Sequence, residues 1–131
     1  MQPDLEGTLL NAETYSWELA SGTLRELAAR SIPVVFCTSK TRAETGPLQD
    51  AMGVHDPFIV ESGGALCLPD ETIVLGAPYE EILDRFRQLK QLTGGAVLGF
   101  SDLTNEELAR EAGLTVGQAA LARRREYEEP F

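Results

Sequence analysis

The chain has 131 residues, of which 43% are hydrophobic and 24% are charged, and its formal net charge is -10 at pH 7. This length predicts one ordinary domain's worth of material, and the composition excludes a disordered or fibrous chain. The negative charge argues against nucleic acid or an anionic membrane as a partner, because both would be repelled. An anionic small ligand would need local cations or a bound divalent metal at its site.

Cysteine usage and the terminal sequence indicate a cytoplasmic protein. Cys37 and Cys67 each lie in an apolar stretch, which is typical of buried, unpaired thiols in a reducing compartment. The first residues do not have the basic and apolar pattern of an export signal, and no run of about 18 apolar residues occurs. We therefore expect no membrane partner.

The first half of the chain alternates between helical and strand patterns. Apolar residues at helical spacing predict a helix over 17–30, and the apolar run 32–37 is typical of a buried parallel strand. A second helix is expected over 42–52, ended by Gly53 in the left-handed conformation, and a second strand over 58–60. This order with short connections predicts a doubly wound α/β sheet.

The second half has an α+β pattern. A hairpin is expected after residue 64, followed by a helix that begins after Pro78, a strand over 96–100 and two short helices. The last two helices each begin with a capping box, Thr104 with Glu107 and Thr115 with Gln118. The predicted fold class is α/β, with a partial Rossmann-like parallel sheet core over 1–64 and an α+β cap module over 65–131.

Asp4 and Glu6 are the first candidate catalytic residues. They are two positions apart, so on an extended backbone both side chains project from one face. One carboxylate can attack phosphorus to form an aspartyl-phosphate, while the other protonates the leaving oxygen and later activates water. The same short pattern, taken alone, is also typical of solvated acids before a turn.

Thr38, Ser39 and Lys40 follow directly after the predicted strand that ends at residue 37. Open α/β sheets bind ligands at the carboxyl ends of their strands, so these side chains are candidates for phosphate binding. A hydroxyl could donate a hydrogen bond to a phosphate oxygen, and Lys40 could offset its charge. The alternative interpretation is a helix cap with surface cations.

Several segments together resemble mannosyl-3-phosphoglycerate phosphatases of the haloacid dehalogenase (HAD) superfamily. The resemblance covers nearly the whole chain. It is carried by the segments 4–10 (Asp-Leu-Glu-Gly-Thr-Leu-Leu), 14–18, 33–44, 56–65 (Asp-Pro-Phe-Ile-Val-Glu-Ser-Gly-Gly-Ala), 99–104 and 125–131 (Arg-Glu-Tyr-Glu-Glu-Pro-Phe).

This resemblance implies an HAD-like core with a class IIB cap, Mg²⁺ dependence, and release of phosphate from mannosyl-3-phosphoglycerate to leave mannosylglycerate. Asp4 would be the nucleophile and a magnesium ligand, and Glu6 the general acid and base with its carbonyl on the metal. Thr38 would bind the phosphate. Arg125, in the cap, would contact the carboxylate of the substrate; its alternative role is that of a surface cation near the end of a helix.

The sequence departs from the family pattern at four places. Only residues 1–3 precede Asp4, where relatives have a hydrophobic strand, and Glu6 and Ser62 replace an Asp and an Asn. The chain also ends at Phe131, before a Lys and a Gly-Asp-x-x-x-Asp loop of the family. We therefore expect a chain truncated at both ends that is weakly active or inactive alone. Its exposed sheet edges are expected to permit self-association.

Three functional hypotheses follow from these observations. The leading one is a Mg²⁺-dependent phosphomonoester hydrolase whose partner is a small-molecule sugar phosphate. The second is a non-catalytic fragment or sugar-phosphate-binding module. The third is a related HAD sugar phosphatase with a different substrate.

Overall fold

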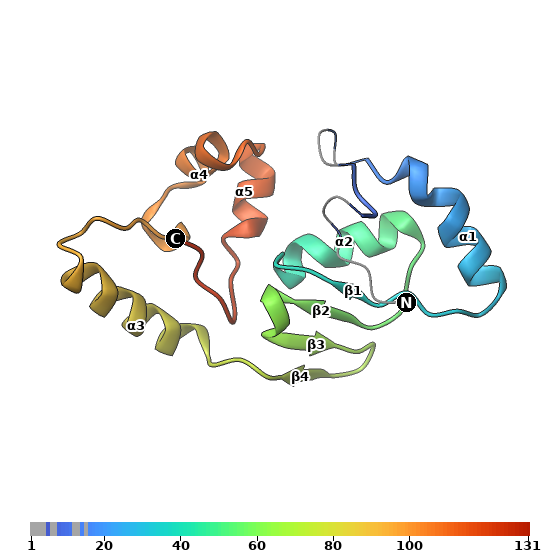
Figure 1. Cartoon of the computed structure of the whole chain (residues 1–131), viewed down its shortest axis with the longest axis horizontal. Coiled ribbons are helices and arrows are strands. Elements are labelled where there is room, and N and C mark those ends of the chain that lie inside the picture. The colour runs from blue at the N-terminus through green and yellow to red at the C-terminus, as the bar shows by residue number, and fades with distance from the viewer. Residues whose placement is uncertain (1–4, 6–7, 12–13, 15) are drawn as a thin grey trace.

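We describe the chain from a computed structural model that covers residues 5, 8–11, 14 and 16–131. Four short strands form one sheet in the order β1-β2-β3-β4 (Figure 1). Strand β1 (Phe36–Cys37) runs parallel to β2 (Phe58–Val60), whereas β3 (Ala65–Cys67) and β4 (Thr72–Val74) continue the sheet as an antiparallel hairpin. The predicted α/β class is confirmed.

The register places small and branched side chains side by side in the middle of the sheet. Ala65 lies opposite Val60 on one side and opposite Val74 on the other. Val60, Ala65 and Cys67 form a small buried cluster against which Phe58 and Tyr127 pack. Tyr127 comes from the end of the chain, so the sheet is partly covered by a segment that is distant in sequence.

The predicted strand over 32–37 is shorter in the structure, where only Phe36 and Cys37 form β1. The backbone groups before them have partners outside the sheet. Ile32 N–H donates to the carbonyl of Leu27, and Val34 N–H donates to Asp56 Oδ2 at 2.8 Å. The apolar run therefore enters the sheet only at its end.

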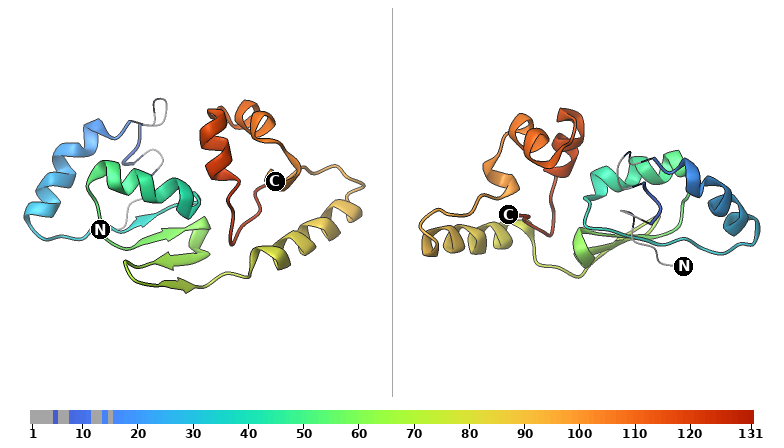
Figure 2. Two further views of the ribbon diagram at one scale, coloured as in Figure 1. Left: turned by 180° about the vertical axis from the view of Figure 1, so that it is seen from behind. Right: turned by 45° about the horizontal axis from the view of Figure 1, so that its top comes forward.

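The helices predicted for the first half are confirmed. A 3₁₀ turn, η1 (Glu18–Ala20), leads into α1 (Ser21–Ala29), and α2 (Arg42–Met52) ends at Gly53 with φ 67°. Figure 2 shows α1 and α2 on the same side of the sheet. Between them lies the main core, formed by Leu5, Leu10, Leu24, Val34, Phe36, Met52 and Val54.

The second half contains three helices: α3 (Tyr79–Leu92), α4 (Asn105–Ala112) and α5 (Val116–Ala122). Both predicted capping boxes are present at α4 and α5. These two helices pack on one another through a separate core of Leu108, Ala109, Ala119 and Ala122. Among the described helices, none combines the length and the apolar composition of a membrane-spanning segment.

The prediction of a strand over 96–100 is wrong. Residues 96–99 have no regular structure, and a 3₁₀ turn, η3 (Phe100–Asp102), begins where the strand was expected to end. The C-terminal segment runs beside this region, and Phe100 N–H donates to the carbonyl of Pro130 at 3.0 Å. Gly99 N–H donates to Asp102 Oδ2, which caps the 3₁₀ turn. This backbone group therefore bonds to a side chain and not to a neighbouring strand.

The hairpin β3–β4 belongs to the same sheet as β1 and β2, although it follows the predicted domain boundary. The predicted division at residue 64 stays a prediction, and the hairpin that follows it is hydrogen-bonded to β2 in the same sheet. Strand β4 lies at the edge of that sheet, where Ile73 and Val74 are exposed. Self-association through such an edge also stays a prediction.

Candidate active site

The two predicted catalytic carboxylates, Asp4 and Glu6, lie outside the described residues. The residue between them, Leu5, is fully buried in the main core. Its carbonyl accepts hydrogen bonds from the N–H groups of Leu9 and Leu10 at 3.2 and 2.8 Å. The assignment of Asp4 and Glu6 to catalysis and metal binding stays a prediction.

The loop after β1 carries the predicted phosphate-binding residues. Thr38 is buried, and its N–H donates to the carbonyl of Ile59 at 3.1 Å, which extends the β1–β2 ladder by one bond. Thr38 Oγ1 accepts from Lys40 N–H at 3.1 Å, so the hydroxyl proton itself is directed elsewhere. Ser39 is exposed, and Lys40 Nζ lies 3.9 Å from Glu44 Oε1.

Thr41 joins this loop to both α2 and α5. Its hydroxyl accepts from Glu44 N–H at the start of α2, and it lies 3.0 Å from two acceptors, Glu44 Oε2 and the carbonyl of Leu121. Its one proton can serve either acceptor. The Thr41 side chain is fully buried, so this hydroxyl helps to hold α5 against the loop.

Removing the Thr41 hydroxyl should therefore cost more than removing an exposed cap. We expect Thr41→Val to lower the free energy of unfolding by about 2 kcal/mol, because a cap and a buried contact are both lost. The control Thr115→Val removes the exposed cap of α5 and should cost about 1 kcal/mol. Urea unfolding followed by circular dichroism compares them, and equal losses would contradict the role given to the Leu121 contact.

The loop after β2 lies directly beside the loop after β1. Glu61 N–H donates to the carbonyl of Lys40, and Ser62 N–H donates to the carbonyl of Thr38, both at 3.1 Å. Glu61 and Ser62 have φ values of 48° and 55°, a left-handed conformation that is costly for residues other than Gly and Asn. Strain of this kind is often found at functional sites.

Glu61 connects the sheet to the C-terminal segment. Its buried carboxylate accepts hydrogen bonds from Glu126 N–H at 3.1 Å and from Tyr127 N–H at 2.7 Å. The sequence alone predicts no role for Glu61. The available signal was an acidic residue placed directly between a buried strand and a Gly-Gly pair.

Burial raises the pKa of the Glu61 carboxyl above its usual value of 4.5, although the N–H groups of Tyr127 and Glu126 act in the opposite direction. Between the usual and the raised pKa, the folded state binds more protons than the unfolded state. The contribution of this group to stability is therefore complete below pH 4.5 and is lost as the pH rises through the raised pKa.

This shift predicts a pH-dependent difference between the wild-type chain and Glu61→Gln. The unfolding free energy of the wild type, minus that of the variant, should fall as the pH rises from about 4 to 8. Urea unfolding at a series of pH values measures this difference. A difference that rises with pH would mean that the N–H donors outweigh burial.

Arg125 reaches the loop after β1 from the opposite half of the chain. Its Nη1 donates to the carbonyl of Ser39 at 2.7 Å, and its Nε donates to the carbonyl of Ala122 at 2.8 Å. The guanidinium also lies 5.3 Å from the centre of the Phe100 ring, and the side chain is only 6% exposed. Arg125 thus adjoins the candidate site, and its contact with a substrate carboxylate stays a prediction.

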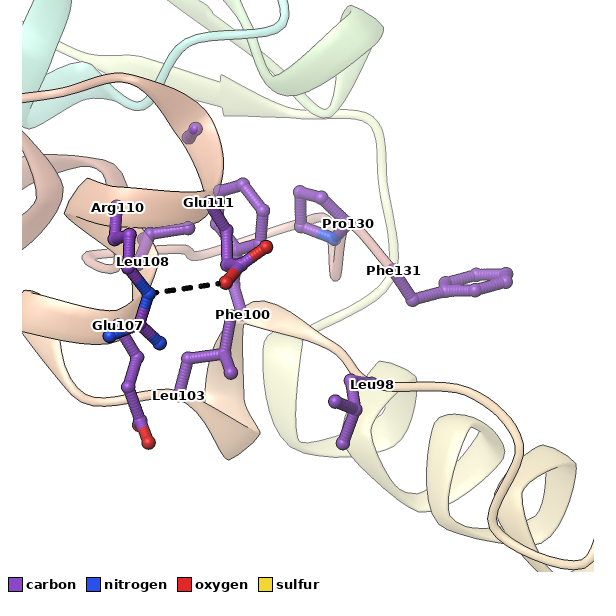
Figure 3. A pocket seen from close by; sticks show the side chains of 10 residues that line it. Leu98, Phe100, Leu103, Glu107, Leu108, Arg110, Glu111, Pro130 and Phe131 are labelled. Atoms are coloured by element: carbon purple, nitrogen blue, oxygen red, sulfur yellow. Dashed lines mark hydrogen bonds and ion pairs between the residues drawn. The ribbon is translucent and has the colours of Figure 1, made fainter.

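Among the cavities that the described residues line, two lie beside helices α4 and α5. One of about 170 Å³ adjoins the candidate site, and Lys40 and Glu44 line it together with Leu10, Leu48, Leu114, Gln118 and Leu121. The other, of about 580 Å³, lies between α4 and the C-terminal segment and shares none of these residues. Figure 3 shows the second cavity, with the Arg110–Glu111 ion pair among the side chains that line it.

Comparison with known proteins gives close relatives but no matching family model. The chain is 37% identical to a glucosyl-3-phosphoglycerate/mannosyl-3-phosphoglycerate phosphatase from Methanococcoides burtonii over 144 aligned residues. It is 38% identical to a protein of the same name from Persephonella marina over 143 residues. These alignments cover 98% of the chain. The chain is homologous to these phosphatases.

The chain spans about half the length of these phosphatases, 53% and 52% respectively. Solved structures support the HAD-like fold. A phosphatase of the haloalkanoate superfamily from Bacteroides thetaiotaomicron matches 88% of the chain and 46% of its own length, with a TM-score of 0.62 and 20% identity. An HAD subclass IIB sugar phosphatase matches 71% of the chain and 37% of its own length, with a TM-score of 0.56 and 22% identity.

Proposed function

We propose that this chain carries the phosphate-binding part of a phosphomonoester hydrolase that acts on glucosyl- or mannosyl-3-phosphoglycerate. The observation that supports it most is the 37–38% identity to phosphatases of that name over 98% of the chain. The free thiols of Cys37 and Cys67 fit a reducing compartment, and we also propose a cytoplasmic location.

In the proposed reaction, a carboxylate oxygen of Asp4 attacks phosphorus, and the bond between phosphorus and the glycerate oxygen breaks. Glu6 donates a proton to that leaving oxygen and then removes a proton from the water that hydrolyses the aspartyl-phosphate. The Thr38 hydroxyl donates to a phosphate oxygen, and Lys40 offsets the phosphate charge. This role for Thr38 fits a hydroxyl whose oxygen already accepts from the backbone.

We also propose Mg²⁺ as the cofactor, with the Asp4 carboxylate and the Glu6 carbonyl among its ligands. Within residues 5, 8–11, 14 and 16–131, no three acidic, His or Cys side chains lie together as a metal site. When bound, Mg²⁺ would neutralise charge on the phosphate oxygens.

The test is phosphate release from mannosyl-3-phosphoglycerate in the presence of Mg²⁺, measured together with calorimetric binding of the same compound. We expect release by the chain above the background set by Asp4→Asn, and weaker substrate binding by Thr38→Val. A folded chain that neither binds the compound nor releases phosphate would overturn the proposal.

A second candidate function is a sugar-phosphate-binding module without turnover. The buried Thr38 and the neighbouring Lys40 favour it, because these groups could bind a phosphate without any nucleophile. Binding that is unchanged by Asp4→Asn, without phosphate release, would support this second candidate.

A further inference from the structure

Five residues from three separate segments close a ring beside the end of β1. Ser62 N–H donates to the carbonyl of Thr38, and Ser62 Oγ donates to Glu128 Oε1 at 3.2 Å. On the other side of the ring, Arg125 Nη1 lies 3.4 Å from Glu128 Oε2 and donates to the carbonyl of Ser39. Glu128 thus contacts Ser62, which is itself hydrogen-bonded to the loop that carries Thr38.

The carboxylate of Glu128 can still accept further hydrogen bonds. An ionised carboxylate offers about four acceptor positions, and the two contacts to Glu128 are long, at 3.2 and 3.4 Å. Its side chain is 32% exposed, and Ser62 beside it is exposed as well. The carboxylates of Glu61 and Glu129 are buried and accept from neighbouring backbone and side-chain groups.

The chemistry of this carboxylate selects the kind of group that it can bind. An ionised carboxylate only accepts hydrogen bonds, so its ligand must donate, and a second phosphate or carboxylate would be repelled. Two adjacent hydroxyl groups match the two oxygens of one carboxylate. Ser62 Oγ adds a third polar group on the same side, and the buried Arg125 offsets the negative charge of Glu128.

We propose that Glu128 and Ser62 bind adjacent hydroxyl groups of the glycosyl part of the substrate and so determine specificity for glycosylated phosphoglycerate. The inference rests on the proposed function, which puts the phosphate beside Thr38. Arg125 positions Glu128 in this proposal, because its guanidinium is only 6% exposed and already donates to Ser39, Glu128 and Ala122. Its predicted contact with a substrate carboxylate is separate from the contacts to the hydroxyl groups.

The experiment compares two ligands, mannosyl-3-phosphoglycerate and 3-phosphoglycerate, by calorimetry on the full chain. We expect the wild type to bind the glycosylated ligand more tightly. Glu128→Gln should weaken binding of that ligand by about tenfold or more, because a hydrogen bond to a charged group is lost. Binding of 3-phosphoglycerate should change by less than about twofold. Ser62→Ala should also weaken binding of the glycosylated ligand more than binding of 3-phosphoglycerate, but by a smaller factor than Glu128→Gln.

The matched control is Glu126→Gln, because the Glu126 carboxylate pairs with Arg42 at 3.5 Å and does not contact Ser62 or Arg125. It should leave the ratio of the two dissociation constants unchanged. Circular dichroism checks that each variant is folded.

The outcomes separate this inference from the proposed function. Equal losses for both ligands in Glu128→Gln, or a wild type without preference for the glycosylated ligand, overturn the inference. No binding of either ligand by the folded wild type overturns both. A preference that depends on Glu128, found in a chain that releases no phosphate, supports the inference and counts against the proposed hydrolysis.

Discussion

Replacing Glu61 with alanine is expected to lower the free energy of unfolding by about 3 kcal/mol. The Glu61 carboxylate accepts hydrogen bonds from two backbone donors, the N–H groups of Glu126 and Tyr127, and Glu61 is only 2% exposed. Alanine would leave both donors without an acceptor, and a buried unsatisfied donor costs about 1–3 kcal/mol. Urea unfolding of the two chains at pH 7 measures the difference.

The matched control is Glu126→Ala, which removes a neighbouring carboxylate from a partly exposed ion pair with Arg42. Such pairs contribute about 1 kcal/mol or less. Glu61→Gln keeps one acceptor oxygen and should lie between the two alanine variants. If Glu61→Ala costs no more than Glu126→Ala, the carboxylate does not hold the C-terminal segment to the sheet.

The second large effect is expected at Gly99, where alanine should cost about 3 kcal/mol of unfolding free energy through overpacking. A Cβ atom at this buried position would lie 2.7 and 2.8 Å from Cε1 and Cζ of Phe86 and would also overlap Glu129 Oε1. Phe86 is buried and Glu129 accepts from Ser101 and Tyr79, so neither can move away cheaply.

Backbone conformation does not explain this prediction, because Gly99 has φ -100° and ψ 170°, which alanine adopts readily. The control is Gly22→Ala in α1, where no atom outside the helix backbone and the two chain neighbours lies within 4 Å of the added Cβ. That variant should gain about 1 kcal/mol from helix propensity. Thermal or urea unfolding of both variants decides the sign of each change. A neutral Gly99→Ala would show that the Phe86 ring can be displaced.

Features set by neighbouring residues could be predicted from the sequence. The capping boxes of α4 and α5 depend on residues three positions apart, and the left-handed Gly53 depends on the end of its own helix. The strand over 96–100 could not be judged in this way, because a strand also requires a partner. Phe100 N–H donates one backbone hydrogen bond to the neighbouring C-terminal segment, at Pro130, and this bond does not form a strand ladder.

The candidate site was predicted in part. The placement of Thr38 at the end of a buried strand follows from an apolar run and a general rule of α/β sheets, and the structure has it there. The role of Glu61 depends on two N–H groups that lie 65 and 66 positions later, and Arg125 reaches Ser39 across 86 positions. No local pattern contains such contacts.

These long-range contacts have a consequence for the order of folding. The Thr38 loop acquires Arg125 and Glu128 as neighbours only after α3, α4 and α5 have brought the end of the chain back, and closing so long a loop is entropically costly. The two-residue strand β1 and its loop should therefore be among the later parts of the chain to become ordered. Local opening of the C-terminal segment would likewise disturb the Thr38 loop before the core beside α1 and α2 unfolds.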